Sequence, residues 1–272
     1  SLKFGATYEI DEDRMVYASF SEGFHSGGFF GVNQNIRDFE RDQYDPEYAT
    51  SIEVGFKSMM LDNRLRFNVA AFRNEFEDKQ ESFVKIDPDT KTVASVFDNA
   101  AEVLYEGIEV EVLYAATRDL RLFLNAGWLD ANYEEFTTDI TPTDGVVNVV
   151  DASFLEPRNA PEYTLGLGFN FTKQIGAGEM ELFAKYTKIA DFQTDVLNLN
   201  AGRTASGNSE DLSATIGYYF GDYSVSIYGK NLTDEQVEWP VLLGGSPTSG
   251  VLFAAGTITR GRHIGIEFTA EF

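Results

Sequence analysis

Apolar and polar residues alternate along most of the chain with a period of two, which is typical of β-strands that have one apolar face. In the first segment Leu2, Phe4 and Tyr8 share one face, and Lys3 and Thr7 share the other. The pattern recurs in eleven segments, near 1–10, 14–24, 49–61, 64–84, 91–116, 120–136, 161–173, 179–195, 209–220, 223–233 and 260–272. No helical period competes with it over a comparable length, so the sequence predicts an all-β fold.

The connections between these segments are alternately short and long. The short ones are 11–13, 62–63, 117–119, 174–178 and 221–222, and they contain the Asp, Asn and Gly residues that suit hairpin turns. The others are 25–48, 137–160, 196–208 and 234–259, with a shorter one at 85–90. This alternation predicts an antiparallel up-and-down meander with its short turns at one end, as in bacterial outer-membrane barrels.

Alternation alone also fits a soluble β-domain whose apolar face packs inward, and this alternative stays open at the level of pattern. Three features favour a membrane barrel. Several segments exceed ten residues, whereas ordinary strands have five or six. Charged residues lie on the polar face in mid-strand: Glu53, Lys57, Arg64, Arg66, Glu109, Glu111, Arg121, Lys185 and Glu267. Aromatic residues gather near strand ends, as interfacial girdles require: Tyr8, Tyr17, Phe20, Tyr114, Trp128, Tyr133, Tyr163, Phe171, Tyr218, Tyr219, Phe220, Tyr223 and Phe272.

Composition and charge exclude several classes of protein. The chain has no cysteine and two histidines far apart in sequence, so we expect no disulfide scaffold, no metal centre and no cofactor. The formal net charge of −23 argues against nucleic acid as a partner. No run of apolar residues approaches the roughly 18 to 20 that a membrane helix needs, and no signal-peptide pattern opens the chain.

Four stretches carry a family resemblance. They are YASFSEGFHSGG (17–28), the segment 46–78 that begins PEYATSIEVGFK, DNAAEVLYEGIEVEVL (98–113), and the pair YGKNLTDE (228–235) and GRHIGIEFTAEF (261–272). Taken in order, they resemble the C-terminal part of the barrel of TonB-dependent receptors, the outer-membrane transporters of Gram-negative bacteria. Each piece alone is weakly specific, whereas the ordered set covers nearly the whole chain.

The resemblance implies an architecture and a function. Residues 1–272 would be the C-terminal portion of a transmembrane β-barrel, about half of a 22-stranded one, with no plug domain in this chain. An odd strand count leaves two unpaired edges, so residues outside this chain would close the barrel. The implied function is TonB-dependent uptake of a scarce nutrient, a ferric siderophore first of all, in the bacterial outer membrane.

The resemblance also implies partners. These are outer-membrane lipid, an extracellular small-molecule ligand, the TonB complex through the plug region, and the barrel-assembly machinery through the C-terminal strand. Phe272 ends that strand and would act as the assembly signal. We expect no enzyme, because the chain has no GxSxG elbow, HExxH, P-loop or dinucleotide fingerprint. The alternatives are a passive porin-like channel, a receptor for a saccharide or cobalamin and, behind these, an outer-membrane hydrolase.

Ligand-binding candidates come from the long connections. His25 begins the first of them and has aromatic residues near it in sequence, which suits contact with an apolar or aromatic ligand face. Arginines in the long connections could bind an anionic ferric chelate. The full set is His25, Phe29, Phe30, Arg37, Arg41, Tyr44, Arg203 and Trp239. The alternative for the aromatic residues is packing of the loops on themselves or anchoring at the lipid interface, and the alternative for the arginines is exposed loop charge with no specific role. Glu109 and Glu111 are interpreted as charge lining a lumen rather than as a catalytic pair.

Overall fold

The computed structural model describes residues 1–29, 43–86, 93–139, 149–194, 196–197, 209–236, 238–246 and 251–271. The long strands are β1 (Leu2–Asp11), β2 (Arg14–His25), β5 (Glu47–Met60), β6 (Leu65–Ile86), β7 (Val93–Ala115), β8 (Leu120–Asp139), β10 (Tyr163–Ile175), β11 (Gly178–Ile189), β12 (Ser209–Phe220), β13 (Tyr223–Lys230) and β16 (His263–Ala270). The others are β3 (Gly28–Phe29), β4 (Gln43–Tyr44), β9 (Val149–Asp151), β14 (Glu238–Ser246) and β15 (Val251–Ile258). The described residues include no helix long and apolar enough to cross a membrane.

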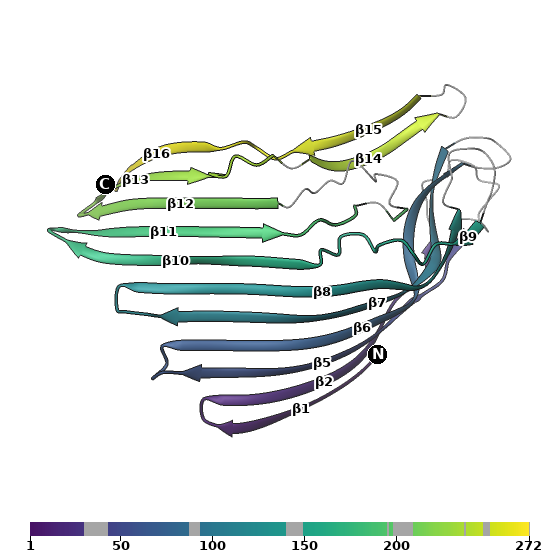
Figure 1. Ribbon diagram of the computed structural model, residues 1–272, viewed down its shortest axis with the longest axis horizontal. Coiled ribbons are helices and arrows are strands. Elements are labelled where there is room, and N and C mark those ends of the chain that lie inside the picture. Colours follow the sequence, from purple (N-terminus) through teal and green to yellow (C-terminus); the bar gives the residue numbers. More distant parts are fainter. Residues whose placement is uncertain are drawn as a thin grey trace.

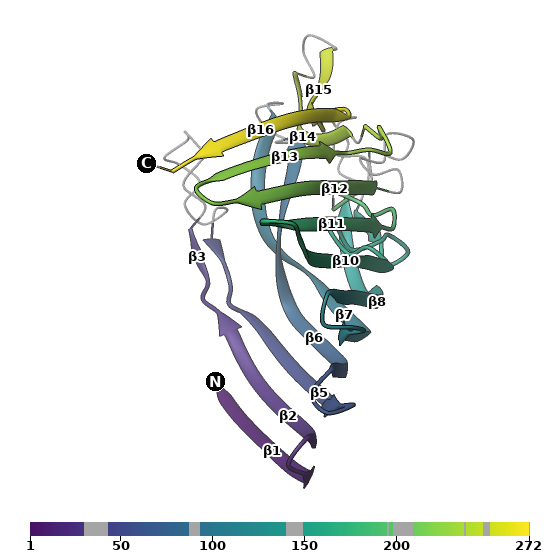
Figure 2. The same cartoon turned by 90° about the vertical axis from the view of Figure 1, so that its left-hand side faces the viewer.

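The long strands form one curved antiparallel sheet in the order β1-β2-β5-β6-β7-β8-β10-β11-β12-β13-β16, and β9 adds to β8 (Figures 1 and 2). Short hairpins join the strands at one end, here called the turn end. Longer connections join them at the other, called the loop end. Because every pairing along this odd-numbered path is antiparallel, the two edge strands β1 and β16 run in the same direction.

The turn-end hairpins depend on residues that tolerate a left-handed backbone. Asp62 and Asn63 have φ values of 55° and 64° in the β5–β6 turn, and Gly221 has 57° in the β12–β13 turn. Asn, Asp and Gly adopt this conformation at low cost. The turns predicted from these residues are therefore confirmed.

One face of the sheet is apolar and carries exposed aliphatic and aromatic side chains. On β12 the positions from Leu212 to Phe220 span about 27 Å of strand, close to the roughly 25 Å apolar band of outer-membrane barrels. At the turn end this band finishes in a row of neighbouring rings, in which Tyr223 lies 5.8 Å from Phe220 and 6.1 Å from Phe268 between ring centroids. Towards the loop end it gives way to ion pairs such as Arg73–Glu106, at 2.9 Å.

The opposite, polar face has aromatic rings that lie over glycines of the neighbouring strand. A Cβ atom on Gly107 would come within 2.5 Å of the Phe72 ring, and one on Gly168 within 2.5 Å of the Phe123 ring. The ring of Tyr17 covers Gly55 in the same way. Since the ring fills the place of the missing side chain, it lies along the wall instead of projecting from it.

The loop end contains a small buried core on the polar face. Val103 and Phe136 are each 1% exposed, and the ring of Tyr133 stacks on Phe136 at 4.5 Å. The other members are Ala101, Ala152, Val196 and Leu197, with Phe76, Tyr105 and Leu155 packed against them. Segments that follow β9 and β11 therefore fold back onto the sheet.

The predicted all-β meander is confirmed, and all eleven predicted segments are strands of the sheet. Several details were wrong. The connection 234–259 contains the hairpin β14–β15, the strand predicted for 179–195 ends at Ile189, and Arg64 lies in a turn instead of mid-strand. Two residues expected in the interfacial girdles lie on the polar face instead. The hydroxyl of Tyr17 donates there to Glu53 at 2.6 Å, and Tyr133 is buried in the loop-end core.

Candidate functional site

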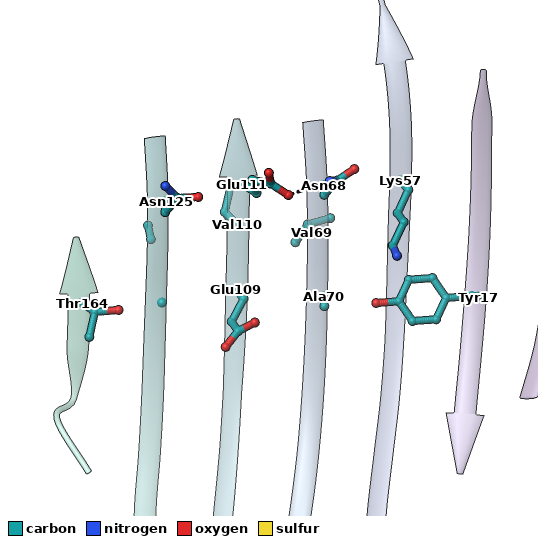
Figure 3. A pocket seen from close by; sticks show the side chains of 12 residues that line it. Tyr17, Lys57, Asn68, Val69, Ala70, Glu109, Val110, Glu111, Asn125 and Thr164 are labelled. Carbon is teal, nitrogen blue, oxygen red and sulfur yellow. Dashed lines mark hydrogen bonds between the residues drawn. The ribbon is translucent and has the colours of Figure 1, made fainter. Parts of the chain in front are cut away.

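A hollow of about 410 Å³ lies on the polar face of β2, β5, β6, β7, β8 and β10 (Figure 3). Strand alternation directs its side chains to one side, and register brings them together, because Asn68 pairs with Glu111 and Glu111 with Asn125. The full lining is Tyr17, Lys57, Asn68, Val69, Ala70, Glu109, Val110, Glu111, Asn125, Ala126, Gly127 and Thr164. The prediction that Glu109 and Glu111 line a polar interior agrees with this position.

Most charged groups in this hollow have partners. Asn68 donates from Nδ2 to Glu111 at 2.8 Å, and the ammonium of Lys57 lies 5.1 Å from the centre of the Tyr17 ring. Glu109 is different: among the described residues its carboxylate has no hydrogen-bond or ion-pair partner. Its register neighbours Ala70 and Gly127 are small, and the Thr164 hydroxyl lies beside Gly127. This carboxylate is free to accept a hydrogen bond from a cation that enters the hollow.

The loop end has a second set of polar contacts, centred on Gln80 of β6. Its Nε2 donates to the carbonyl oxygens of Asp45 at 2.9 Å and Ser26 at 3.3 Å, and its backbone N–H donates to Glu47 at 2.8 Å. Asn99 on β7 binds the same segment, donating from Nδ2 to the Asp45 carbonyl at 2.9 Å. These amides hold both ends of the β2–β5 connection against β6 and β7.

Glu81, next to Gln80, is 1% exposed and has two cations beside it. Lys79 lies 2.5 Å from one carboxylate oxygen, and Arg158, which precedes β10, lies 2.9 Å from the other. A buried carboxylate is stable only when it is paired in this way. β6 therefore fixes the β9–β10 connection as well as the β2–β5 connection.

The predicted ligand-binding residues lie at the loop end where they are described. His25 ends β2 on the polar face, opposite Glu47, and Phe29 in β3 is 64% exposed. Tyr44 in β4 pairs with Gly28, and its ring covers that glycine. Trp239 lies in β14, paired with Thr257. Outside the described residues lie Phe30, Arg37, Arg41, Arg203 and Phe272.

Sequence reasoning missed Gln80, Glu81, Asn99 and Arg158, because each looked like an ordinary polar residue of a strand or loop. The irregularity just before Gln80, where Asp78 has a φ of 52°, is visible only in the structure. No group of three or more described acidic or histidine side chains is placed to hold a metal ion.

Comparison with known proteins places this fold in a family. Residues 1–232 match the family described as "TonB dependent receptor-like, beta-barrel". The chain belongs to this family of outer-membrane β-barrel receptors of Gram-negative bacteria. Among curated proteins, it is 32% identical over 111 residues to a probable TonB-dependent siderophore receptor, PiuA of Acinetobacter baumannii, covering 39% of this chain and 14% of that protein. It is 29% identical over 109 residues to the ferric-pyoverdine 358 receptor of Pseudomonas putida, covering 40% of this chain and 12% of that protein.

Solved structures agree on the fold. The ferric yersiniabactin uptake receptor FyuA of Yersinia pestis superposes with a TM-score of 0.75 at 18% identity, covering 99% of this chain and 37% of that one. The siderophore receptor PiuA of A. baumannii gives a TM-score of 0.69 at 19% identity, covering 98% and 35%. The chain thus spans about a third of the length of these receptors.

Proposed function

We propose that this chain forms part of the wall of a receptor that takes up a ferric siderophore across the outer membrane in a TonB-dependent process. The observation that carries the proposal is the combination of an apolar band on one face with a polar, hollowed wall and inward-folded loop segments on the other. A wall of this kind suits a ligand captured at the loop end, and no covalent chemistry is required of it. The siderophore receptors among its relatives support the choice of ligand class.

We further propose that the sheet is closed by strands outside these residues. Unpaired backbone groups in lipid each cost several kcal/mol, so the edges of β1 and β16 need partners. Since these strands run in the same direction, they cannot pair antiparallel with each other. Two copies standing in the same orientation in the membrane and joined edge to edge would meet the same obstacle. An odd number of further strands between β16 and β1 gives an even total. Every neighbouring pair of strands can then be antiparallel, as in bacterial outer-membrane barrels.

We also propose that the hollow on the polar face contacts a plug domain. A plug domain filling the barrel would cover the polar face, and a basic side chain of that domain would pair with the free carboxylate of Glu109. Energy from the TonB complex would then act on the plug, while the wall stays fixed. Outer-membrane lipid would contact the apolar face, and the assembly machinery would bind the C-terminal segment of the chain, in which Phe272 is the last residue.

The test is uptake of radioactive iron by cells that lack their other siderophore receptors and express the receptor containing this chain. The probes are ferric yersiniabactin, ferric pyoverdine and ferric preacinetobactin, which the related structures name. We expect uptake of at least one chelate, and loss of that uptake when TonB is deleted or the proton gradient is collapsed.

Uptake that persists without TonB would indicate a passive channel and overturn the proposal. If none of the three chelates is taken up but cobalamin or a saccharide is taken up in a TonB-dependent way, the proposed transport mechanism stands. The proposed ligand class is then wrong.

A further inference from the structure

Phe154, in the connection between β9 and β10, has an exposed ring at the apex of a tightly held turn. It is 72% exposed, whereas Ala152 is fully buried and Leu155 packs against the loop-end core. The turn is closed by a hydrogen bond from the Leu155 N–H to the Ala152 carbonyl, at 2.9 Å. The chain therefore fixes the backbone on both sides of a phenyl ring that it leaves in solvent.

The residues before Phe154 are attached to β8. The backbone N–H of Ala152 donates to the Phe136 carbonyl at 2.7 Å, and the Phe136 N–H donates to Ser153 Oγ at 3.0 Å. Asp151, the last residue of β9, accepts from the Ser153 N–H at 3.0 Å. These bonds continue the pairing between β9 and β8 up to the turn itself.

The residues after Phe154 are attached to two other parts of the loop end. Arg158 forms its ion pair with buried Glu81 of β6. The Asn159 N–H donates to the Gln193 carbonyl at 2.7 Å, and Gln193 in turn donates from Nε2 to Glu156 at 3.1 Å. The turn is thus held from β6, from β8 and from the segment that follows β11.

The position of the turn follows from what it covers. Ala152 packs with Val103 and Phe136, which lie on the polar face of the sheet, the same face as the hollow. The turn therefore lies over the polar face at the loop end. Phe154 lies at the apex of this turn, and its ring remains open to solvent at the loop end.

We propose that Phe154 is a preformed binding residue for an aromatic or other flat apolar group of the ligand. This inference rests on the proposed function and adds a ligand contact at the loop end. A ring on an anchored turn loses little conformational freedom when a ligand stacks on it, so most of the stacking and burial energy contributes to affinity.

The test is equilibrium binding of the three ferric chelates to the purified whole receptor in detergent. For the chelate that the unchanged receptor binds, we expect Phe154→Ala to weaken binding about tenfold, equivalent to about 1.4 kcal/mol. Phe154→Tyr keeps the ring face and should bind within about threefold of the unchanged receptor. Because the ring packs against little of the protein, the protease resistance of Phe154→Ala should be unchanged.

Phe24→Ala is the matched control, since Phe24 has a similarly exposed ring, at 62%, on the apolar face of β2. It should leave binding unchanged. If the receptor binds a chelate and Phe154→Ala binds it equally well, the role of Phe154 is wrong and the proposed function stands. An equal loss in Phe24→Ala would also overturn the role of Phe154. If the unchanged receptor binds none of the chelates, the proposed siderophore function fails, and this inference fails with it.

Discussion

The membrane-spanning wall and the loop end belong to one sheet, yet they differ in where their large apolar side chains lie. The wall leaves them exposed, and the loop end buries them. In the wall, large apolar side chains point away from the protein, and Ile266 remains 74% exposed. At the loop end, Phe136 is 1% exposed in a core, and Glu81 on β6 is also 1% exposed. The wall therefore has almost no interior of its own, whereas the loop end has a compact one.

The surroundings explain this difference. In the proposed membrane setting, lipid would replace a protein core for the apolar face, and the wall would depend on complete pairing of its backbone groups between strands. The loop end projects into water, so its segments must bury apolar area against the sheet to stay in place. We therefore expect the two regions to respond differently to the same kind of substitution.

The largest expected effect comes from Phe136→Ala. Removing a fully buried ring that stacks on Tyr133 leaves a cavity, and we expect a loss of about 3 to 5 kcal/mol in the local free energy of unfolding of the loop end. Hydrogen exchange should show faster exchange at 149–159 and 190–194, with little change in the strand segments of the wall.

Phe4→Ala is the control for that variant, because the Phe4 ring is 62% exposed on the apolar face of β1. It should leave exchange at the loop end unchanged. Equal effects of both substitutions on the loop end would contradict the separation of the two regions.

The next effect concerns the buried charge. Glu81→Gln leaves Lys79 and Arg158 without their common partner, and we expect a loss of roughly 2 to 3 kcal/mol at the loop end. The loss stays below that of a fully enclosed pair because Lys79 is 18% exposed and Arg158 is 34% exposed. Exchange at 156–160 measures it. Glu75→Gln, on the same strand, breaks an ion pair with Arg73 that is about half exposed, and should change little.

These two regions also differ in how far the sequence predicts them. Alternation and turn residues were enough to locate the strands of the wall, because both faces repeat with a strict period of two. At the loop end β8 has a bulge opposite Glu102 and Val103, which changes the phase of the strand. Tyr133 and Phe136 consequently share a face although they are three residues apart, which a period of two cannot reveal.

The candidate site was predicted less well for a related reason. The sequence placed His25 and Phe29 correctly in the region of the loop end, since they follow a recognisable strand. It gave no reason to choose Gln80 or Phe154, because their roles depend on contacts between connections that are distant in sequence. The hairpin β14–β15 was missed because Pro240 and the glycines near it interrupt the strand pattern.

A smaller effect tests the glycines of the wall. In Gly168→Ala the new Cβ would overlap the Ala184 carbonyl oxygen and the Phe123 ring, and we expect a loss of about 1 to 3 kcal/mol. Gly166→Ala on the same strand and face is the control, since its Cβ would be 3.9 Å from the nearest atoms. Urea unfolding of the receptor in lipid vesicles compares them. Similar losses in both would show that contact with the Phe123 ring and the Ala184 carbonyl does not govern these positions.

The smallest expected effect is a pH dependence confined to the loop end. The backbone N–H of Ser153 donates to Asp151 and lowers the pKa of this carboxyl below its usual value of 3.8. A lowered pKa in the folded state means that the ionised carboxylate stabilises the turn at every pH above about 3.8, and that this contribution is lost as the pH falls through the folded-state pKa. Protease resistance of the 149–159 connection should therefore be constant from pH 7 to pH 5 and decrease below pH 4. The Asp151→Asn variant should have weaker resistance at pH 7 and a smaller decrease in acid than the unchanged receptor. If Asp151→Asn keeps the acid sensitivity of the unchanged receptor, another group is responsible, and the loop end is less dependent on this cap than its geometry indicates.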